Sequence, residues 1–253
     1  MPFIFLAEFN MAITHYSLHG TEMDHTFHLK PLLTAAVFHD AFARLNYELE
    51  TSAIHLEKLG LSWVLSDMHL EFEGKLPYWR EPYSVEVWVR KNQQVRIFAD
   101  FIAINGYGEA FARGTSVWLV IDQQTRQPVI KPDLLNRFTI ENRAAIPGFR
   151  FSILPESGTV INTATIRIGV NDIDFNLHLN SVRYLGGGID ALGKEFLFSH
   201  RLKAVTVKYM KEVLCEEVVT VVNSRLENGT ILHQIYSDSE EEVCRFISRW
   251  APY

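Results

Sequence analysis

The chain has 253 residues, of which 47% are hydrophobic and 12% aromatic, and it carries a formal net charge of −6. This length and composition allow one large or two small folded domains and exclude an intrinsically disordered chain. The negative charge argues against a general nucleic-acid-binding protein, because phosphate contacts need a basic face.

The expected location is the cytoplasm. The two cysteines, Cys215 and Cys244, are too few for a disulfide framework and are typical of small core side chains in a reducing compartment. Residues 1–6 are apolar but lack the basic residues of a signal peptide, and no apolar run is long enough to span a membrane. Four histidines within 15–28 match no ligand spacing, so we expect no metal and no cofactor.

The first half of the chain predicts a long helix followed by an antiparallel sheet. Residues 14–29 look extended, and residues 34–58 carry apolar side chains every three or four positions, as in an amphipathic helix that ends at Gly60. Strands are then expected at 64–72, 83–90, 96–104 and 109–121, with a tight turn at Asn105-Gly106. This order predicts an α+β unit.

The second half repeats this plan. An extended segment is expected at 159–170, a helix at 181–197 and strands at 202–210, 218–225, 231–237 and 243–250, with another Asn-Gly pair at Asn228-Gly229. Residues 136–158, rich in Pro and Gly, read as a connection. We therefore predict two copies of one fold: an N-terminal domain at 1–135, a linker at 136–158 and a C-terminal domain at 159–253.

A polar series precedes the second predicted helix. Asp174, Asn176, His178 and Asn180 alternate with three apolar residues, and in an extended segment this alternation would place all four polar groups on one side. A carboxylate, an amide and an imidazole together suit polar catalysis at a carbonyl group. A half-buried strand with a solvated polar face would show the same pattern, so spacing alone leaves both readings open.

The first half has no Asp-x-Asn-x-His series before its helix, where Phe27-His28-Leu29-Lys30 stand. We therefore expect one working site per chain, in the C-terminal domain. Glu212, between two apolar strands, is either a partly buried carboxylate of that site or an ordinary surface residue.

Motifs of two common enzyme classes, nucleotide-binding enzymes and serine hydrolases, are not supported by the sequence. Residues 188–194 spell the start of a phosphate-binding loop, but Glu195 replaces the required Ser or Thr and the stretch lies inside a predicted helix. Three glycines at 186–188 instead predict a smooth helix side that the sheet or an acyl chain approaches closely. The chain has no Gly-x-Ser-x-Gly nucleophile elbow.

The stretch 174–185, Asp-Phe-Asn-Leu-His-Leu-Asn-Ser-Val-Arg-Tyr-Leu, resembles the Asp-x-Asn-x-His-x-Asn-x-x-Lys-Tyr-Ile signature of the acyl-acyl-carrier-protein thioesterases, the plant FAT type and its bacterial relatives. Residues 61–69, 77–81 and 114–118 are similar to further motifs of that family in the same register. The resemblance runs from about Tyr16 to near the C-terminus. It implies two hotdog domains in tandem, each a long helix wrapped by an antiparallel sheet.

The resemblance also implies hydrolysis of fatty acyl-carrier-protein thioesters, and a departure of this chain from the plant enzymes leads us to expect no Ser or Cys nucleophile. By motif position the catalytic residues are Asp174, Asn176, His178 and Glu212, and the cysteine that follows this Glu in plant enzymes is Val213 here. His178 and Glu212 are expected to activate a water, with backbone N–H groups at the helix start as oxyanion donors.

Substrate contacts are predicted as well. The fatty acyl chain is expected in an apolar tunnel between the helix and the sheet of the N-terminal half, lined by Val37, Phe38, Met68 and Phe72, and the predicted pocket also includes Tyr184 and Gly187. Basic side chains near the site are expected to dock the acidic acyl carrier protein: Arg183, Lys194, Arg201, Lys203, Lys208 and Lys211. A homodimer stays open, and the alternatives are a hotdog acyl-CoA thioesterase or an inactive acyl-thioester-binding module.

Overall fold

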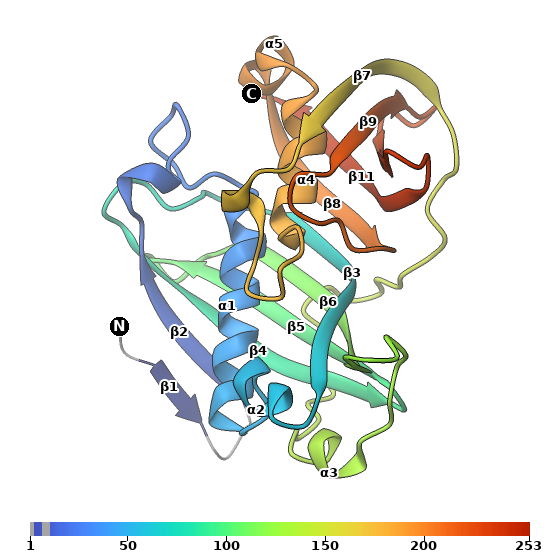
Figure 1. Ribbon diagram of the computed structural model, residues 1–253. Coiled ribbons are helices and arrows are strands. Elements are labelled where there is room, and N and C mark those ends of the chain that lie inside the picture. Colours follow the sequence, from blue (N-terminus) through green and yellow to red (C-terminus); the bar gives the residue numbers. More distant parts are fainter. Residues whose placement is uncertain (1–2, 7–10) are drawn as a thin grey trace. The chain divides into compact units, whose positions relative to one another are not determined.

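The computed structural model describes residues 3–6 and 11–253, and the chain divides into two compact units, Met1–Phe149 and Arg150–Tyr253. Each unit is an antiparallel sheet with a helix lying across one of its faces (Figure 1). Within the described residues, no helix combines the length and the apolar character that crossing a membrane requires.

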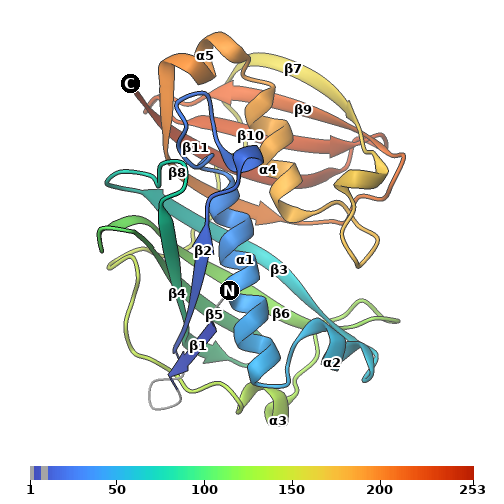
Figure 2. The ribbon, with the colours of Figure 1, turned by 90° about the vertical axis from the view of Figure 1, so that its left-hand side faces the viewer.

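In the first unit, helix α1 (Leu33–Glu48) crosses a sheet in the order β1-β2-β4-β5-β6-β3 (Figure 2). The short helices are η1 (Gly20–Glu22), α2 (Ala53–Glu57) and α3 (Pro132–Leu135). The strands are β1 (Phe3–Leu6), β2 (Met11–Ser17), β3 (Leu61–Phe72), β4 (Pro82–Gln93), β5 (Arg96–Asn105) and β6 (Ala110–Asp122).

In the second unit, helix α4 (Ser181–Asp190) packs on a sheet in the order β7-β9-β10-β11-β8. This order reproduces β2-β4-β5-β6-β3 of the first unit, so the predicted internal repeat and the α+β class are confirmed. The other helices are η2 (Val170–Asp172) and α5 (Lys194–Ser199). The strands are β7 (Thr159–Arg167), β8 (His200–Tyr209), β9 (Val218–Arg225), β10 (Ile231–Ser237) and β11 (Glu242–Pro252).

Both long helices are shorter than predicted. The helix expected at 34–58 ends at Glu48, because Glu50 adopts a left-handed conformation with a φ of 53° and the Thr51 hydroxyl bonds the buried Asn46 side chain at 2.8 Å. The helix expected at 181–197 is divided at Gly193, whose φ of 84° favours glycine. Apolar periodicity continues across both breaks, so it conceals them.

Within each unit the helix packs on the sheet of that unit. The large side chain is on the helix in the first unit and on the sheet in the second, and a glycine lies opposite it in each case. In the first unit Phe38 of α1 stacks on Phe101 at 4.8 Å, and Gly114 of β6 makes room for it. In the second unit the glycine is on the helix: a Cβ atom on Gly188 would lie 2.4 Å from Cζ of Phe246. The close approach predicted at 186–188 is therefore made, at Gly188, to the sheet.

Replacing Gly188 with Ala is expected to lower the free energy of unfolding by about 1–3 kcal/mol, because the added methyl group must displace the buried Phe246 ring. Gly186→Ala is the matched control, since among the described residues none lies within 4 Å of a Cβ atom there. That change should raise stability by up to about 1 kcal/mol through helix propensity. Thermal melting of both variants checks this, and equal shifts would contradict the packing account.

A buried polar cluster lies under α4. The ring of His233 bonds the Asn223 side chain at 2.7 Å through Nδ1 and the Ser248 hydroxyl at 2.7 Å through Nε2, and all three residues are fully buried. Burial lowers the pKa of His233 to about 3. His39 of the first unit shifts the same way, its pKa lowered by burial to about 4.

Because both imidazoles have a lower pKa when folded than when unfolded, folding stability should be fully present above about pH 6.5. It should then fall as the pH drops toward 3, by roughly 1.4 kcal/mol per pKa unit for each histidine. Urea unfolding at pH 7 and pH 4.5 measures this loss. Between pH 7 and pH 4.5 the His233→Gln variant should lose less stability than the unsubstituted chain. An equal loss would show that His233 does not contribute to the pH dependence of stability.

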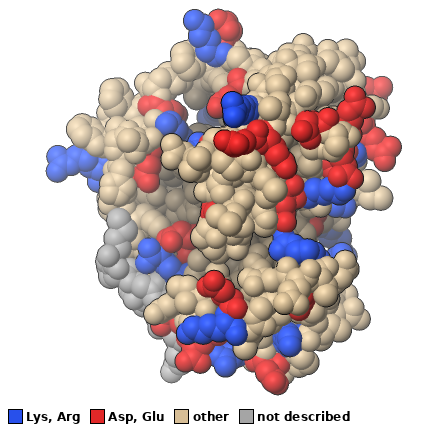
Figure 3. All heavy atoms as spheres, in the orientation of Figure 1, with Lys and Arg blue, Asp and Glu red and all other residues tan. Residues whose placement is uncertain are grey.

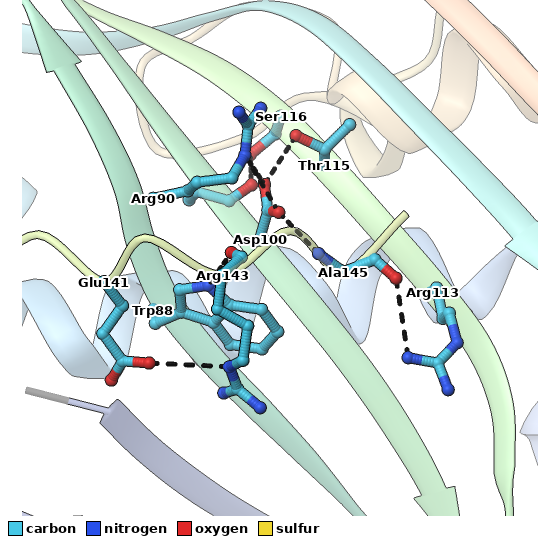
Figure 4. A network of polar contacts seen from close by, with 10 residues as sticks. Trp88, Arg90, Asp100, Arg113, Thr115, Ser116, Glu141, Arg143 and Ala145 are labelled. Atoms are coloured by element: carbon cyan, nitrogen blue, oxygen red, sulfur yellow. Dashed lines mark hydrogen bonds and ion pairs between the residues drawn. The ribbon is translucent and has the colours of Figure 1, made fainter. Parts of the chain in front are cut away.

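The start of the predicted linker is packed onto the first unit. The buried Asp100 carboxylate accepts hydrogen bonds from Nε of Arg90 at 3.1 Å and from the Ala145 backbone N–H at 2.8 Å (Figure 4). The Arg143 guanidinium lies 3.7 Å from the centroid of the Trp88 ring, whose Nε1–H donates to the Arg143 carbonyl. Residues up to 149 thus extend the first unit.

Candidate functional site

The polar series at 174–180 forms a tight turn, so the predicted extended segment is wrong. The Asp174 N–H donates to the His178 carbonyl at 2.9 Å, the Leu177 N–H donates to the Asp174 carbonyl at 3.0 Å, and Leu177 has a φ of 65°. Phe175 and Leu177 point outward, with 77% and 73% exposure, while Leu179 is buried. The turn therefore does not sort polar and apolar side chains onto opposite faces.

The Asp174 side chain stabilises this turn. Its Oδ1 accepts the Asn176 backbone N–H at 2.8 Å, which is the bond of an Asx turn. Because the Asp174 backbone also bonds the His178 carbonyl, Asp174 fixes the positions of both Asn176 and His178.

The structure brings His178 and Glu212 together. Nε2 of His178 lies 3.2 Å from Oε2 of Glu212, in the segment between β8 and β9. The backbones are joined as well: the Leu179 N–H donates to the Val213 carbonyl at 2.8 Å, and His178 and Leu214 form an antiparallel bridge. The two side chains are 23% and 40% exposed, so a substrate can reach them while much of each group is shielded from water.

The start of α4 is capped from within. Oδ1 of Asn180 accepts the Val182 N–H at 3.0 Å, and the Asn180 carbonyl accepts the Arg183 N–H at 2.8 Å. The expected oxyanion donors at the helix start are thus wrong for Val182 and Arg183, since a capping side chain and a turn already use these two N–H groups.

Two tyrosines, the buried Tyr184 and the half-buried Tyr209, support the site through their hydroxyl groups. The Tyr184 hydroxyl donates to the Lys211 carbonyl at 3.2 Å, and the Tyr209 hydroxyl donates to the Ser181 carbonyl at 3.0 Å. Burial raises the pKa of both hydroxyls above their ordinary value, so both remain protonated donors. Tyr184, predicted to line the pocket, thus joins α4 to the segment that carries Glu212.

The other predicted pocket residues belong to the helix–sheet layers. Phe38, Met68 and Phe72 are buried in the first unit, and Val37 is half-buried. A Cβ atom on Gly187 would lie 2.8 Å from Cδ1 of Ile166, so α4 approaches β7 closely here.

The predicted docking cations are partly neutralised. Arg183 lies 3.4 Å from Asp172, Lys194 lies 3.9 Å from Glu195, and Lys211 pairs with Glu241. Arg201, Lys203 and Lys208 lie along β8. On the face drawn in Figure 3, basic side chains are interspersed with acidic ones.

The first unit contains a counterpart of the site that the sequence interpretation missed. Residues 23–29 form the same turn, with Asp24, Thr26 and His28 at the positions of Asp174, Asn176 and His178. The expectation that the first half lacks a polar series is therefore wrong. The sequence did contain a signal for this counterpart: each of the three residues lies 150 positions before its partner in the second unit, with Thr26 in place of Asn.

Among the described residues, no group of three or more His, Cys, Asp and Glu side chains is placed to hold a metal ion. The turn carries the His178 imidazole and the Asn176 amide, and it places the imidazole beside the Glu212 carboxylate. These can accept a proton, orient an attacking water and donate a hydrogen bond to a carbonyl oxygen.

Comparisons with known proteins bear on the family and the fold of the chain. The acyl-ACP thioesterase N-terminal domain model matches residues 10–138, and the corresponding C-terminal domain model matches residues 156–252. An oleoyl-acyl carrier protein thioesterase of Arabidopsis thaliana is 27% identical over 179 residues, covering 66% of this chain and 48% of that protein. A palmitoyl-acyl carrier protein thioesterase of Gossypium hirsutum is 27% identical over 219 residues, covering 77% of this chain and 51% of that protein.

The chain thus spans about half the length of these curated relatives. Among solved structures, an acyl-ACP thioesterase from Bacteroides thetaiotaomicron aligns with a TM-score of 0.86 and 20% identity, over 96% of this chain and 98% of that one. The 12:0-ACP thioesterase from Umbellularia californica aligns with a TM-score of 0.85 and 18% identity, over the same shares. These alignments confirm the tandem hotdog fold, and the two domain matches show that the chain belongs to the acyl-ACP thioesterase family.

Proposed function

We propose that this chain hydrolyses fatty acyl-carrier-protein thioesters to free fatty acid and carrier protein. The observation that carries the proposal is the pairing of His178 with Glu212 at 3.2 Å, on a turn held by Asp174, within a chain that both family domains match. The named substrates of its relatives, oleoyl and palmitoyl carrier-protein thioesters, indicate the substrate class.

In the proposed mechanism water is the nucleophile. His178, polarised by Glu212, takes a proton from the water as its oxygen attacks the thioester carbonyl carbon. The tetrahedral intermediate then collapses, the C–S bond breaks, and the proton passes from His178 to the departing sulfur. Asp174 holds the turn, and the Asn176 amide orients the water or donates to the carbonyl oxygen.

A thiol nucleophile is absent from this proposal because Val213 follows Glu212 and is fully buried. Val213→Cys is therefore expected to change kcat/KM for carrier-protein thioesters less than about twofold, since the new side chain would be a small buried hydrophobe. Steady-state kinetics of the purified variant check this. A large rate gain, or acylated enzyme seen by mass spectrometry, would favour a cysteine mechanism instead.

The function is tested by incubating the purified chain with carrier proteins that bear acyl groups of different lengths and measuring the free fatty acids released. The expected result is release with a preferred chain length and a higher kcat/KM than for the matching CoA thioesters. Faster turnover of CoA thioesters would favour an acyl-CoA thioesterase. Bound thioester that stays intact for hours would identify a non-catalytic binding module.

The expected surroundings of the reaction are also proposals. We place the acyl chain against the helix–sheet core of the first unit. That core is apolar around Phe38 and Phe101, whereas the core of the second unit contains the polar side chain of His233. A cytoplasmic location is supported by both cysteines being free. Light scattering of the purified chain would distinguish a monomer from the homodimer that the sequence left open.

A further inference from the structure

The turns of the two units correspond hydrogen bond for hydrogen bond. In the first unit the Thr26 N–H donates to Oδ1 of Asp24 at 2.8 Å, as the Asn176 N–H does to Asp174 at 2.8 Å. The Asp24 N–H donates to the His28 carbonyl at 2.8 Å, matching the 2.9 Å bond from Asp174 to His178. Phe27, which follows Thr26, and Leu177, which follows Asn176, both adopt the left-handed conformation, with φ angles of 63° and 65°. His28 therefore occupies the same backbone position on its turn as His178 does on the other.

The side chains of the first turn form a hydrogen-bonded chain. The Thr26 hydroxyl donates to Oδ1 of Asp24 at 2.6 Å and lies 2.9 Å from Nδ1 of His28. A hydroxyl has one proton, so when it is donated to Asp24 the proton between Thr26 and His28 must come from the imidazole. Neutral His28 is then protonated at Nδ1 and carries an acceptor lone pair on Nε2, and the half-buried ring is fixed in orientation.

The first turn differs from the second at the position of the carboxylate. Leu29 donates its N–H to the Pro77 carbonyl at 2.9 Å, just as Leu179 donates to Val213. The residue before Pro77 is Leu76, whereas the residue before Val213 is Glu212. The imidazole is therefore kept, while the carboxylate that would help it to deprotonate water is replaced by an apolar side chain.

Exposed aromatic rings lie beside His28, together with the Glu81 carboxylate, which accepts the Tyr78 backbone N–H at 2.7 Å and interacts electrostatically with His28. The Tyr78 ring packs edge-on against His28 at 5.3 Å and lies 6.3 Å from the Phe27 ring. Phe27, Tyr78 and Trp79 are 54%, 40% and 49% exposed. An acceptor nitrogen beside exposed aromatic rings suits an extended ligand that alternates amide N–H groups with methylene groups, which is the chemistry of a pantetheine arm.

We propose that the turn formed by Asp24, Thr26 and His28 is a second binding site for the pantetheine arm of an acyl thioester, which it holds without hydrolysing it. Nε2 of His28 accepts an amide N–H of the arm, and the rings of Phe27 and Tyr78 cover its methylene groups. Hydrolysis does not follow, because Leu76 stands where the second unit has Glu212. The nearby Glu81 instead corresponds to Glu217: each accepts a backbone N–H of its own loop, from Tyr78 and Leu214. This proposal rests on the proposed function, since it assigns to the first unit the same ligand class.

The test counts bound ligands per chain. The probe is an acyl-pantetheine ketone in which a methylene group replaces the thioester sulfur, so that it cannot be hydrolysed, and binding is measured by calorimetry and native mass spectrometry. The unsubstituted chain should bind two molecules, and His28→Ala should bind one. Thr26→Val, which keeps the side-chain shape but removes the hydroxyl that orients the imidazole, should weaken the second site at least tenfold. His25→Ala, an exposed histidine of the same turn, is the matched control and should still bind two.

Each count has a distinct meaning. No bound probe would overturn both this proposal and the proposed function. One bound probe in the unsubstituted chain, unchanged by His28→Ala, would overturn the second site and leave the proposed function standing. Two bound probes that persist in His28→Ala and Thr26→Val would remove the second site from this turn. Thermal melts of each variant establish that the counts refer to folded protein.

Discussion

His178→Ala is expected to lower kcat/KM for carrier-protein thioesters by about 10²- to 10⁴-fold, because the site loses the base that takes the proton from water. Binding of a non-hydrolysable thioester analogue should change much less than this, since the imidazole acts mainly in the transition state. Fatty acid release under single-turnover conditions measures the chemical step directly. His15→Ala, a histidine of β2 far along the chain from the second turn, is the control and should keep normal turnover.

Near-normal turnover by His178→Ala would remove this histidine from the mechanism. A rise in KM with unchanged kcat would instead assign it to uniform substrate binding. Thermal melting of the variant is needed beside the kinetics, because His178 lies on a turn that precedes α4.

Glu212→Gln should lower kcat by about 10²-fold or more with a small change in KM. Glutamine keeps the size of the side chain and can still bond His178, but it removes the negative charge that stabilises the protonated imidazole. Rate measurements at saturating substrate give the change in kcat. Glu227→Gln, at an exposed turn between β9 and β10, is a matched control with no expected effect.

If Glu212 acted only in substrate docking, Glu212→Gln would raise KM and leave kcat unchanged. That result would leave His178 as the sole base and would contradict the paired role proposed for the two residues.

The strands were the most predictable part of the fold. Alternation of apolar residues, bounded by turn residues such as Asn228-Gly229, placed β9 at 218–225 and β10 at 231–237, with the bounds the structure has. Two antiparallel sheets with one packed face each produce this pattern directly. The helix ends were harder, because the break after Glu48 depends on a local side-chain bond from Thr51 to Asn46, which apolar periodicity does not record.

The shape of the polar turn could not be read from its spacing. Asp174 and Asn176 alternate as they would in a strand, but Asp174 bonds the backbone two residues on and so closes a turn. Local side-chain bonds of this kind compete with extended structure and leave no trace in hydrophobic periodicity.

The residue types of the candidate site were nevertheless predictable. The pairing of His178 with Glu212 was expected from the motifs of a resembling family, and the structure places these two side chains in contact. In the first half, His28 was passed over because Thr26 stands where the motif has Asn. The backbone hydrogen bonds that make the two turns equivalent are visible only in three dimensions.

The most direct test of the proposed water activation is a double-mutant cycle on His178→Ala and Glu212→Ala, with single-turnover release of fatty acid as the readout. If the imidazole and the carboxylate act as one unit, the single-turnover rate of the double variant should lie within about threefold of that of the slower single variant. Losses that multiply, so that the double variant is slower by the product of the two single effects, would show that the residues act independently and would contradict the paired mechanism.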